Sequence, residues 1–343
     1  MVLRRGLGAT LAGAVLAVAV AGGAFAGPAL DGVKKKGYVA CAVNTGLAGF
    51  SMADKQGHYT GLDVDVCRAV AAAIFGDAEK TKFVPATAEQ RFALLQSGEV
   101  DILTRNTTWT LQRETDLGFN FAPVNYYDGQ GFMVAKKAGV TAAKELDGAT
   151  VCVQPGTTTE LNLADYFRTH KMTVKPLVIE KLDEVENAFF SGRCDAYTTD
   201  RSGLAATRAG RAPNPDDYVI LPDVISKEPL APAVRHGDDE WFDIVKWTEF
   251  GMLDAEEKGV TSKNVDAMMK SGDPVVKRML GVTPGMGKSL HLDDKWLYNI
   301  IKQVGNYGES FERNVGEDSS LKLARGLNAL WTKGGLMYGM PIR

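Results

Sequence analysis

The chain has 343 residues, enough for one large or two medium domains. Its 39 basic and 42 acidic side chains give a net charge of −3. This balance argues against nucleic acid or anionic lipid as a partner, because both attract positively charged surfaces.

The N-terminus has the pattern of a cleaved secretory signal. Arg4 and Arg5 precede an apolar run over 7–20, and residues 24–26 (AFA) supply a small-x-small cleavage site. The run is short and no basic stop-transfer cluster follows it, which disfavours a membrane anchor. A signal peptide over 1–26 leaves 343 − 26 = 317 residues with a charge of 37 − 42 = −5. We therefore expect an exported protein without direct membrane insertion.

Strands and helices alternate through the first half of the chain. Strands are expected at 38–43, 83–85 and 100–103, a hairpin or loop at 53–61, and helices from 61 and over 88–97. Acidic Asp63 and Asp65 fall in the first turn of the earlier helix, where they suit its dipole. This alternation predicts an α/β fold with a mainly parallel sheet.

A polar stretch, 104–119, follows the strand at 100–103. It contains Asn106 and Thr108, and Arg113 comes five residues after Thr108. Hydroxyls and an arginine at a strand end suit a carboxylate, because guanidinium binds it bidentately. Taken alone, the stretch is also typical of a solvated turn before a helix.

The middle of the chain repeats this organisation. A strand at 149–153 leads through a turn into a helix, and another helix is expected at 182–191. Thr157 and Glu160 have capping-box spacing, which predicts free backbone N–H groups and hence an anion site, or simply a capped helix. Residues 97–101 (SGEVD) match 191–195 (SGRCD) at an offset of 191 − 97 = 94 residues. The chain is therefore predicted to contain two similar α/β lobes.

The offset also places Asn106 opposite Asp200. Ligands of open α/β sheets bind beyond the carboxyl ends of the strands. Two facing lobes would bring two polar walls together. The first wall would carry a cation and hydroxyls, from Asn44, Asn106, Thr108 and Arg113. The second would carry an anion and a helix N-terminus, from Thr157, Thr158 and Asp200. This fits a zwitterion, whose carboxylate pairs with Arg113 and the amides of Thr157 and Thr158 and whose ammonium pairs with Asp200.

Four cysteines in an exported chain predict disulfides. Three pairings are possible, and Cys41–Cys67 with Cys152–Cys194 is preferred because each pair then lies inside one lobe. Such loops contribute roughly 3–4 kcal/mol each. The cysteine spacings are not CxxC-like and the histidines are scattered, so no metal site is expected.

Two segments are expected to connect the lobes. Residues 131–135 would cross to the second lobe and 230–235 would cross back, which divides the chain into lobe 1 (27–130 and 234–343) and lobe 2 (131–233). The tail is predicted to be helical and to have a packing role. Two of its expected helices cover 241–259 and 274–280. A third has apolar positions 296, 300 and 304 on one face. A fourth has apolar positions 323, 327 and 330 on one face and ends at 334–335.

Residues 61–71 (GLDVDVCRAVA) resemble the signature of periplasmic amino-acid-binding proteins of ABC transporters. The resemblance continues through 106–113, 156–160 and 195–200, and the tail segment 307–314 (YGESFERN) is similar to the branch that binds L-amino acids generally. It implies the two-lobed type II periplasmic-binding-protein fold, in which each lobe has a mainly parallel sheet flanked by helices, here with a helical C-terminal tail.

The resemblance also implies roles for residues. The arginine that binds the α-carboxylate corresponds to Arg113, and the aspartate that binds the α-ammonium to Asp200. Other ligand contacts correspond to Asn106, Thr108 and Thr157, with Asn44 as a reader of the side chain.

Relatives restricted to one amino acid often hold its side chain between aromatic rings. Those positions are Leu47 and Ala88 here, so we expect a wider pocket and a broad specificity that includes polar and acidic amino acids. Phe50 and Trp109 are expected to line the pocket too, although core packing explains Trp109 equally well.

The sequence thus predicts a monomeric periplasmic receptor that closes on L-amino acids, uses no cofactor and delivers them to the membrane permease of an ABC importer. The chief alternative is an enzyme, because the resemblance implies that this fold also carries a dehydratase acting on cyclohexadienyl acids. Glu160 and Asp63 would be the acid–base candidates, but both are explained by their places at helix starts, so no catalytic residue is expected. A sensory ectodomain or structural binding module is a third reading, which the lack of a later transmembrane segment disfavours.

Overall fold

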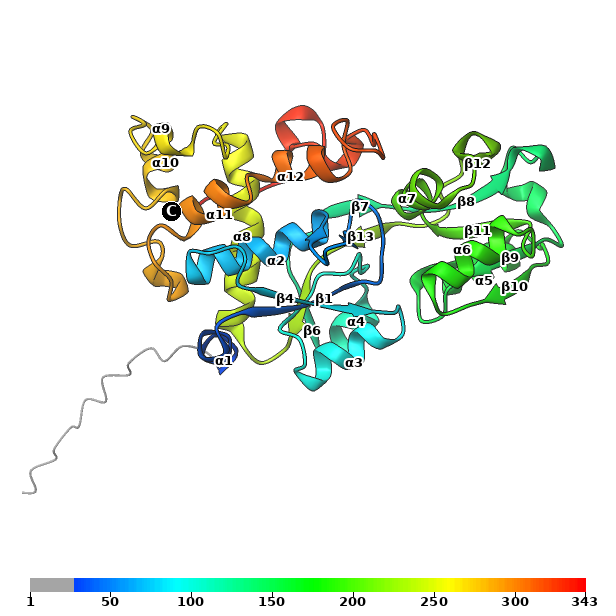
Figure 1. The fold of residues 1–343 in the computed structure, drawn as a ribbon, viewed down its shortest axis with the longest axis horizontal. Coiled ribbons are helices and arrows are strands. Elements are labelled where there is room, and N and C mark those ends of the chain that lie inside the picture. Colours follow the sequence, from blue (N-terminus) through cyan, green and yellow to red (C-terminus); the bar gives the residue numbers. More distant parts are fainter. Residues whose placement is uncertain (1–27) are drawn as a thin grey trace, which may run out of the picture.

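The computed structural model describes residues 28–343, so the predicted signal peptide, 1–26, lies outside the described residues. Figure 1 shows two groups of elements, each built around its own sheet, with β7 and β13 between them. Each sheet has five strands. The predicted α/β fold with two lobes is confirmed, and we call the two groups lobe 1 and lobe 2.

The sheet of lobe 1 combines parallel and antiparallel strands. Its order is β4 (Thr81–Ala86), β1 (Val39–Asn44), β5 (Ile102–Leu103), β14 (Ala233–Arg235) and β6 (Phe119–Phe121). β1 is parallel to β4 and β5, whereas β14 is antiparallel to β5 and β6. Every residue of β1 is buried, as expected for a central strand covered on both faces. The α-helices of this lobe are α1 (Pro28–Lys36), α2 (Leu62–Phe75), α3 (Gln90–Ser97), α4 (Leu111–Thr115), α8 (Asp239–Glu257), α9 (Val265–Met268), α10 (Pro274–Met279), α11 (Trp296–Gln303) and α12 (Tyr307–Asn314).

The sheet of lobe 2 has the same mixed arrangement. Its order is β10 (Lys175–Val178), β9 (Thr150–Val153), β11 (Ala196–Asp200), β8 (Gln130–Ala135) and β12 (Tyr218–Ile220). β9 is parallel to β10 and β11, and β8 is antiparallel to β11 and β12. The helices are α5 (Thr158–Thr169), α6 (Leu182–Phe190) and α7 (Arg201–Arg211). Both sheets are therefore mixed rather than mainly parallel, because the strand that follows each crossing between the lobes enters its sheet antiparallel.

Short elements complete the chain. The predicted hairpin at 53–61 is the pair β2 (Met52–Ala53) and β3 (Tyr59–Thr60). Single 3₁₀ turns are η1 (Lys136–Ala138), η2 (Ala143–Leu146), η3 (Pro215–Asp217), η4 (Lys288–Leu290), η5 (Gly326–Asn328) and η6 (Trp331–Lys333).

Two short strands connect the lobes. β7 (Tyr126–Asp128) pairs antiparallel with β13 (Glu228–Leu230), and this ribbon lies between the two sheets (Figure 1). The predicted crossing at 131–135 is wrong, because these residues belong to β8 inside the sheet of lobe 2. We propose that the β7–β13 ribbon is the hinge, since a few residues between two rigid bodies can absorb a closing motion.

The last part of the tail departs from the predicted helix. Positions 323, 327 and 330 do not share a helix: the segment holds only the η5 turn, and Leu327 is exposed. Lys322 has a φ of 49°, in the left-handed region that interrupts a helix. Asn328 instead pairs with β7, where its Oδ1 accepts from Tyr127 N at 2.6 Å and its Nδ2 donates to Tyr127 O at 3.2 Å. Contacts with the ribbon thus determine this segment's conformation.

The two disulfides are confirmed as predicted. Cys41 in β1 is bonded to Cys67 in α2, and Cys152 in β9 is bonded to Cys194, just before β11. Each bond joins elements of a single lobe, so neither restricts movement of one lobe relative to the other.

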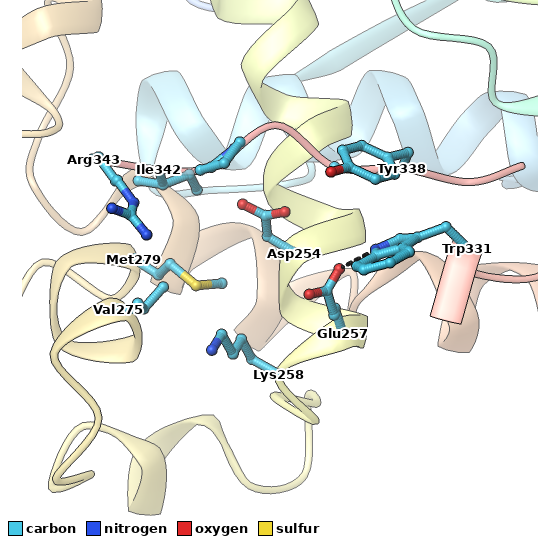
Figure 2. A pocket seen from close by; sticks show the side chains of 11 residues that line it. Asp254, Glu257, Lys258, Val275, Met279, Trp331, Tyr338, Ile342 and Arg343 are labelled. Carbon is cyan, nitrogen blue, oxygen red and sulfur yellow. Dashed lines mark hydrogen bonds between the residues drawn. The ribbon is translucent and has the colours of Figure 1, made fainter. Parts of the chain in front are cut away.

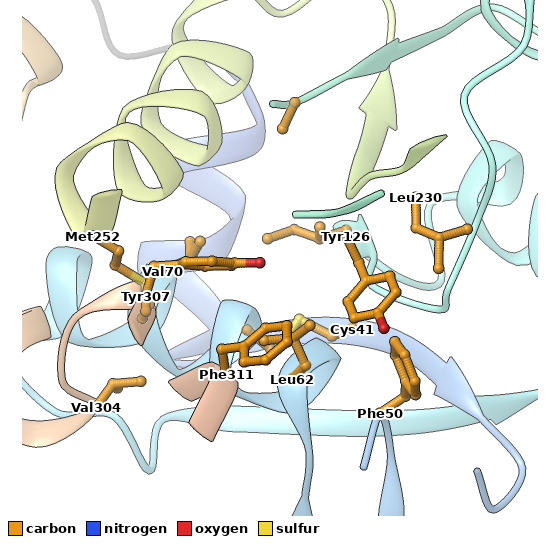
Figure 3. Packing of buried hydrophobic residues seen from close by; sticks show 14 of the residues in the cluster. Cys41, Phe50, Leu62, Val70, Tyr126, Leu230, Met252, Val304, Tyr307 and Phe311 are labelled. Carbon is orange, nitrogen blue, oxygen red and sulfur yellow. A yellow bond between two sulfur atoms is a disulfide. The ribbon is translucent and has the colours of Figure 1, made fainter. Parts of the chain in front are cut away.

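The core of lobe 1 extends to the hinge ribbon through stacked aromatic rings (Figure 3). Tyr126 of β7 contacts Phe50 edge-on at 5.5 Å between ring centroids and stacks on Phe311 of α12 at 6.1 Å. Tyr307 Oη donates a hydrogen bond to Asn125 O at 2.9 Å. Helix α12, the segment whose sequence is similar to the general-specificity branch, therefore supports one side of the hinge.

Glu249 of α8 gives the fold an expected pH dependence. It is buried, its Oε1 has no hydrogen-bond partner within residues 28–343, and burial raises its pKa from 4.5 to about 8. The folded state holds this proton more tightly than the unfolded state does. The contribution of protonated Glu249 to the unfolding free energy is therefore fully present below pH 4.5 and is lost as the pH rises toward about 8. In wild type, Glu249 should lower the unfolding free energy by roughly 2–3 kcal/mol as the pH rises from 5 to 7. In Glu249→Gln, which has no titrating group at this position, this decrease should be absent.

Urea unfolding of wild type and Glu249→Gln at pH 5, 6 and 7 measures this difference. Glu99→Gln, at an exposed position of the same lobe, is the matched control and should behave as wild type. Parallel pH curves for wild type and Glu249→Gln would contradict the assignment.

Candidate functional site

A polar pocket lies between the lobes, where strand ends of both sheets converge. It holds about 330 Å³ of empty space, which includes space open to solvent. All eleven residues of its lining within the described chain are polar: Asn44, Arg91, Arg105, Asn106, Thr108, Gln154, Thr157, Thr158, Thr159, Thr199 and Asp200. Six of the seven predicted ligand-binding residues are among them, the exception being Arg113. Asn106 and Asp200, which the offset of 94 residues relates, therefore line the same pocket from the two lobes.

On the wall of lobe 1, the loop after β5 is held by a buried carboxylate. Asp63 Oδ2 accepts from Asn106 N at 2.8 Å, and Asn106 has a φ of 26°, a conformation that costs energy for a residue with a side chain. Asn44 Nδ2 donates to Asn106 Oδ1 at 3.1 Å, which joins the ends of β1 and β5. Burial raises the pKa of Asp63 to about 7, opposed by the Asn106 amide and Arg105. Asp63 therefore positions the loop, which explains it without catalysis.

On the wall of lobe 2, helix α5 begins at the pocket. Thr157 is its N-cap and accepts from Glu160 N at 3.0 Å. Glu160 Oε2 accepts from Gly156 N at 3.1 Å, one residue earlier than a full capping box requires. Glu160 is thus occupied at the helix start. Thr157, Thr158 and Thr159 line the pocket, and the first backbone N–H groups of any α-helix have no intrahelical partners.

Asp200 supplies the negative charge of the pocket. It ends β11 and is 6% exposed. Burial raises its pKa well above the ordinary value, Asp128 and Glu228 add to this, and Arg91 and Arg113 oppose it. A cationic group of a ligand next to Asp200 would stabilise its ionised form.

Glu228 of β13 links the two walls and was missed by the sequence reasoning. Its Oε2 accepts from the hydroxyls of Thr108 at 2.6 Å and Thr158 at 2.8 Å, and its Oε1 accepts from Asn162 Nδ2 at 2.8 Å. Thr108 belongs to lobe 1, whereas Thr158 and Asn162 belong to lobe 2. Hydrogen bonds therefore span the cleft and the lobes are in contact, an arrangement that no local motif around Glu228 indicated.

Three buried arginines surround the pocket, of which only Arg113 was predicted. Arg113 Nη1 donates to Thr108 O at 2.7 Å and its guanidinium lies over the Phe92 ring, so it sits behind Thr108. Burial lowers the pKa of Arg113 to about 10, opposed by Glu228 and Asp200. Arg91 and Arg105 line the pocket instead. The position of Arg105, two residues after the buried strand β5, could have indicated its place at the pocket. Arg91 lies on α3 and carries no such signal.

The four residues expected to line the pocket are not among its eleven lining residues in the described structure. Leu47 and Phe50 are in the core of lobe 1, and Ala88 is buried. Trp109 stacks on Phe121 at 5.7 Å and is 36% exposed, with its Nε1 donating to Glu114 Oε2. Leu47 and Phe50 thus pack into the core of lobe 1 and Trp109 packs on Phe121, which leaves polar side chains to line the pocket.

A second pocket, of about 630 Å³, lies within lobe 1 between α8, α10 and the C-terminal segment (Figure 2). Trp331 Nε1 donates to Glu257 Oε2 at 3.0 Å there, and burial raises the pKa of the neighbouring Asp254 to about 7. No strand ends converge on it, so the cleft remains the better candidate. Within residues 28–343, no group of three or more His, Cys, Asp or Glu side chains is placed to hold a metal. None of the helices in this range combines the length and the apolar composition that a bilayer span requires.

Comparison with known proteins gives a consistent result. Residues 39–278 match the family of bacterial extracellular solute-binding proteins, family 3. The chain is 58% identical over 316 residues to the general L-amino acid-binding periplasmic protein AapJ of Rhizobium johnstonii, covering 92% of each chain. It is 54% identical over 315 residues to the glutamate/glutamine/aspartate/asparagine-binding protein BztA of Rhodobacter capsulatus, covering 92% of this chain and 93% of that one.

Solved structures agree. A periplasmic binding protein of an ABC transporter from Brucella ovis, with glutathione bound, superposes with a TM-score of 0.90 at 57% identity, covering 92% of this chain and 99% of that one. The cysteine-binding protein of Campylobacter jejuni superposes with a TM-score of 0.59 at 26% identity, covering 72% and 96%. The chain therefore belongs to family 3 of the bacterial extracellular solute-binding proteins, which are receptors and not enzymes.

Proposed function

We propose that this protein is a periplasmic receptor that captures L-amino acids of several kinds between its lobes and delivers them to the membrane permease of an ABC importer. The observation that carries the proposal is the pocket itself, where Asp200 and the start of α5 face a wall rich in arginine. The names of the Rhizobium and Rhodobacter relatives support amino acids as the ligands. We further propose that it acts as a monomer.

The ligand's α-ammonium is assigned to Asp200, whose buried carboxylate gains most from a cation. The Thr108 and Thr158 hydroxyls already donate to Glu228. The α-carboxylate is therefore assigned to the backbone N–H groups of Thr157 and Thr158, with the positive charge of Arg113 behind Thr108. Asn44 and Asn106 complete the wall of lobe 1.

Binding to both walls explains why the ligand would favour closure. A ligand that contacts only one lobe has equal affinity for the open and closed forms, whereas one that bridges both stabilises the closed form. The permease would then distinguish loaded from empty receptor by the relative position of the lobes.

A thermal-shift panel over the twenty L-amino acids tests the function. Several should raise the melting temperature, since a ligand at about 100 times its Kd adds about 2.7 kcal/mol to the unfolding free energy. Decarboxylated amines such as cadaverine are the control and should have no effect, because they lack the α-carboxylate. A single responding amino acid would contradict broad specificity, and the absence of any response would contradict the receptor function.

A further inference from the structure

A second space lies on the other side of the hinge ribbon from the cleft. It holds about 1110 Å³ of empty space, which includes space open to solvent, and its lining within residues 28–343 shares no residue with that of the cleft. Its floor is 126–129 of the ribbon, one wall is the tail segment 323–328, and the other wall is formed by lobe 2 around α7. In Figure 1, α7 and α12 lie on one side of the ribbon, and α4 and α5 lie on the other. We call this space the rear groove.

Each wall of the rear groove exposes a large apolar side chain. Leu327 of the tail is 55% exposed, and Val224 of lobe 2 is 58% exposed. Val224 reaches the ribbon, because a Cβ added at Gly129 would meet its Cγ1 at 2.4 Å. Removing apolar surface from water is favourable, so contact between Leu327 and Val224 would stabilise any form of the protein in which they meet.

Each wall is held in place by hydrogen bonds on its own side of the groove. Asn328 bonds the main chain of Tyr127 through both atoms of its amide, which fixes the tail wall to the ribbon. Arg201, the first residue of α7, donates from Nη1 to Leu221 O at 2.6 Å, which fixes the other wall within lobe 2. The width of the rear groove therefore depends on the angle between the lobes rather than on movement of either wall.

The lobes are closed over the cleft in this structure. Thr87 Oγ1 donates to Glu180 Oε1 at 2.8 Å, and Arg91 Nη2 donates to Gly156 O at 3.3 Å, each from lobe 1 to lobe 2. Opening of the cleft would break these bonds and turn the lobes about the ribbon. Because the ribbon lies between the two spaces, the rear groove would narrow as the cleft widens.

We propose that the two walls of the rear groove meet when the receptor opens, so that Leu327 and Val224 stabilise the open form and lower the affinity for every ligand. This rests on the proposed function, in which a ligand bound between the lobes favours closure. The apparent Kd is the Kd of the closed form divided by the fraction of the receptor that is closed, so a more stable open form raises it. Leu327 and Val224 thus determine affinity without contact with the ligand.

Titration calorimetry with the two strongest ligands of the amino-acid panel tests the proposal on variants of Leu327. Leu327→Ala removes the apolar contact of the open form and should tighten the binding of both ligands by the same factor, about 3- to 10-fold. Leu327→Met keeps an apolar side chain of similar size and should bind as wild type does. Leu336→Ala is the matched control, because Leu336 is an exposed leucine of the same tail that does not line the rear groove. It should leave both affinities unchanged.

A crosslink tests the approach of the two walls without a ligand. All four native cysteines are paired in disulfides, so Leu327→Cys combined with Val224→Cys adds two free thiols to a chain that has no others. Mild oxidation of this ligand-free variant should join the two thiols, which requires their Cα atoms to come within about 7 Å. A saturating amino acid should slow the reaction by about 10-fold or more, because it depletes the open form. Leu336→Cys combined with Val224→Cys is the control and should stay unjoined.

Circular dichroism checks that each variant is folded. Leu327→Ala that binds as wild type does, or more weakly, would overturn the proposal, as would tighter binding of one ligand alone. Absence of the crosslink in the ligand-free protein would overturn it too, since the walls would then not meet. Wild type that binds no amino acid would contradict the proposed function, and the crosslink would still decide whether the walls of the rear groove meet.

Discussion

Replacing Asp200 by asparagine is expected to weaken amino-acid binding by about 30-fold or more without unfolding the protein. Asp200 is the one acidic residue among the pocket lining in the described chain, and the nearby Glu228 carboxylate already accepts from Thr108, Thr158 and Asn162. Loss of one partner of a shielded charge pair costs about 2–5 kcal/mol, which corresponds to this range. Titration calorimetry with the best ligand of the amino-acid panel measures the change.

Asp195→Asn is the control for this experiment. Asp195 precedes the same strand but is exposed, and its carboxylate accepts from Thr150 N at 2.7 Å outside the pocket. Its replacement should leave affinity unchanged. Arg113→Ala should also abolish binding in a folded protein, because it removes the charge behind Thr108. Near-normal affinity in Asp200→Asn or Arg113→Ala would refute the corresponding ligand contact.

Replacing Asp65 by alanine is expected to reduce the unfolding free energy by about 1–3 kcal/mol. Asp65 Oδ2 accepts hydrogen bonds from three side chains of α12: Ser310 Oγ at 2.5 Å, Arg313 Nη2 at 2.5 Å and Asn314 Nδ2 at 2.6 Å. Loss of the carboxylate would remove the acceptor of the buried Ser310 hydroxyl at the interface of α2 and α12, whereas Asn314 Nδ2 would keep its bond to Ser310 O. Urea unfolding measures the change.

Asp183→Ala is the matched control, because Asp183 also lies in the first turn of a helix but is exposed. It should cost less than about 1 kcal/mol, the usual size of a helix-dipole effect. If the two variants were destabilised equally, Asp65 would act through the dipole of α2 alone, as its sequence position first suggested. Weaker amino-acid binding in Asp65→Ala would also be informative, because α12 packs against Tyr126 of the hinge.

The sequence alone determined the elements whose signals are local. The helix that begins at Leu62, the buried strand β1 and the cap at Thr157 follow from periodicity, burial and capping chemistry within a few residues. The repeated segment at 97–101 and 191–195 was enough to bring Asn106 and Asp200 to one pocket, because equivalent strands of similar lobes end at the same edge. Lobe membership likewise gave both disulfides.

Only the tertiary structure decided which side chains complete the pocket and connect the lobes. Glu228 and Arg91 carry no local pattern. Glu228, on the β7–β13 ribbon, bonds Thr158 at a separation of 70 residues, and Arg91 of lobe 1 bonds Gly156 of lobe 2 at a separation of 65. The crossings and the final segment depend on pairing of β7 with β13 and with Asn328. These contacts arise when two lobes meet, and no periodicity within one segment encodes them.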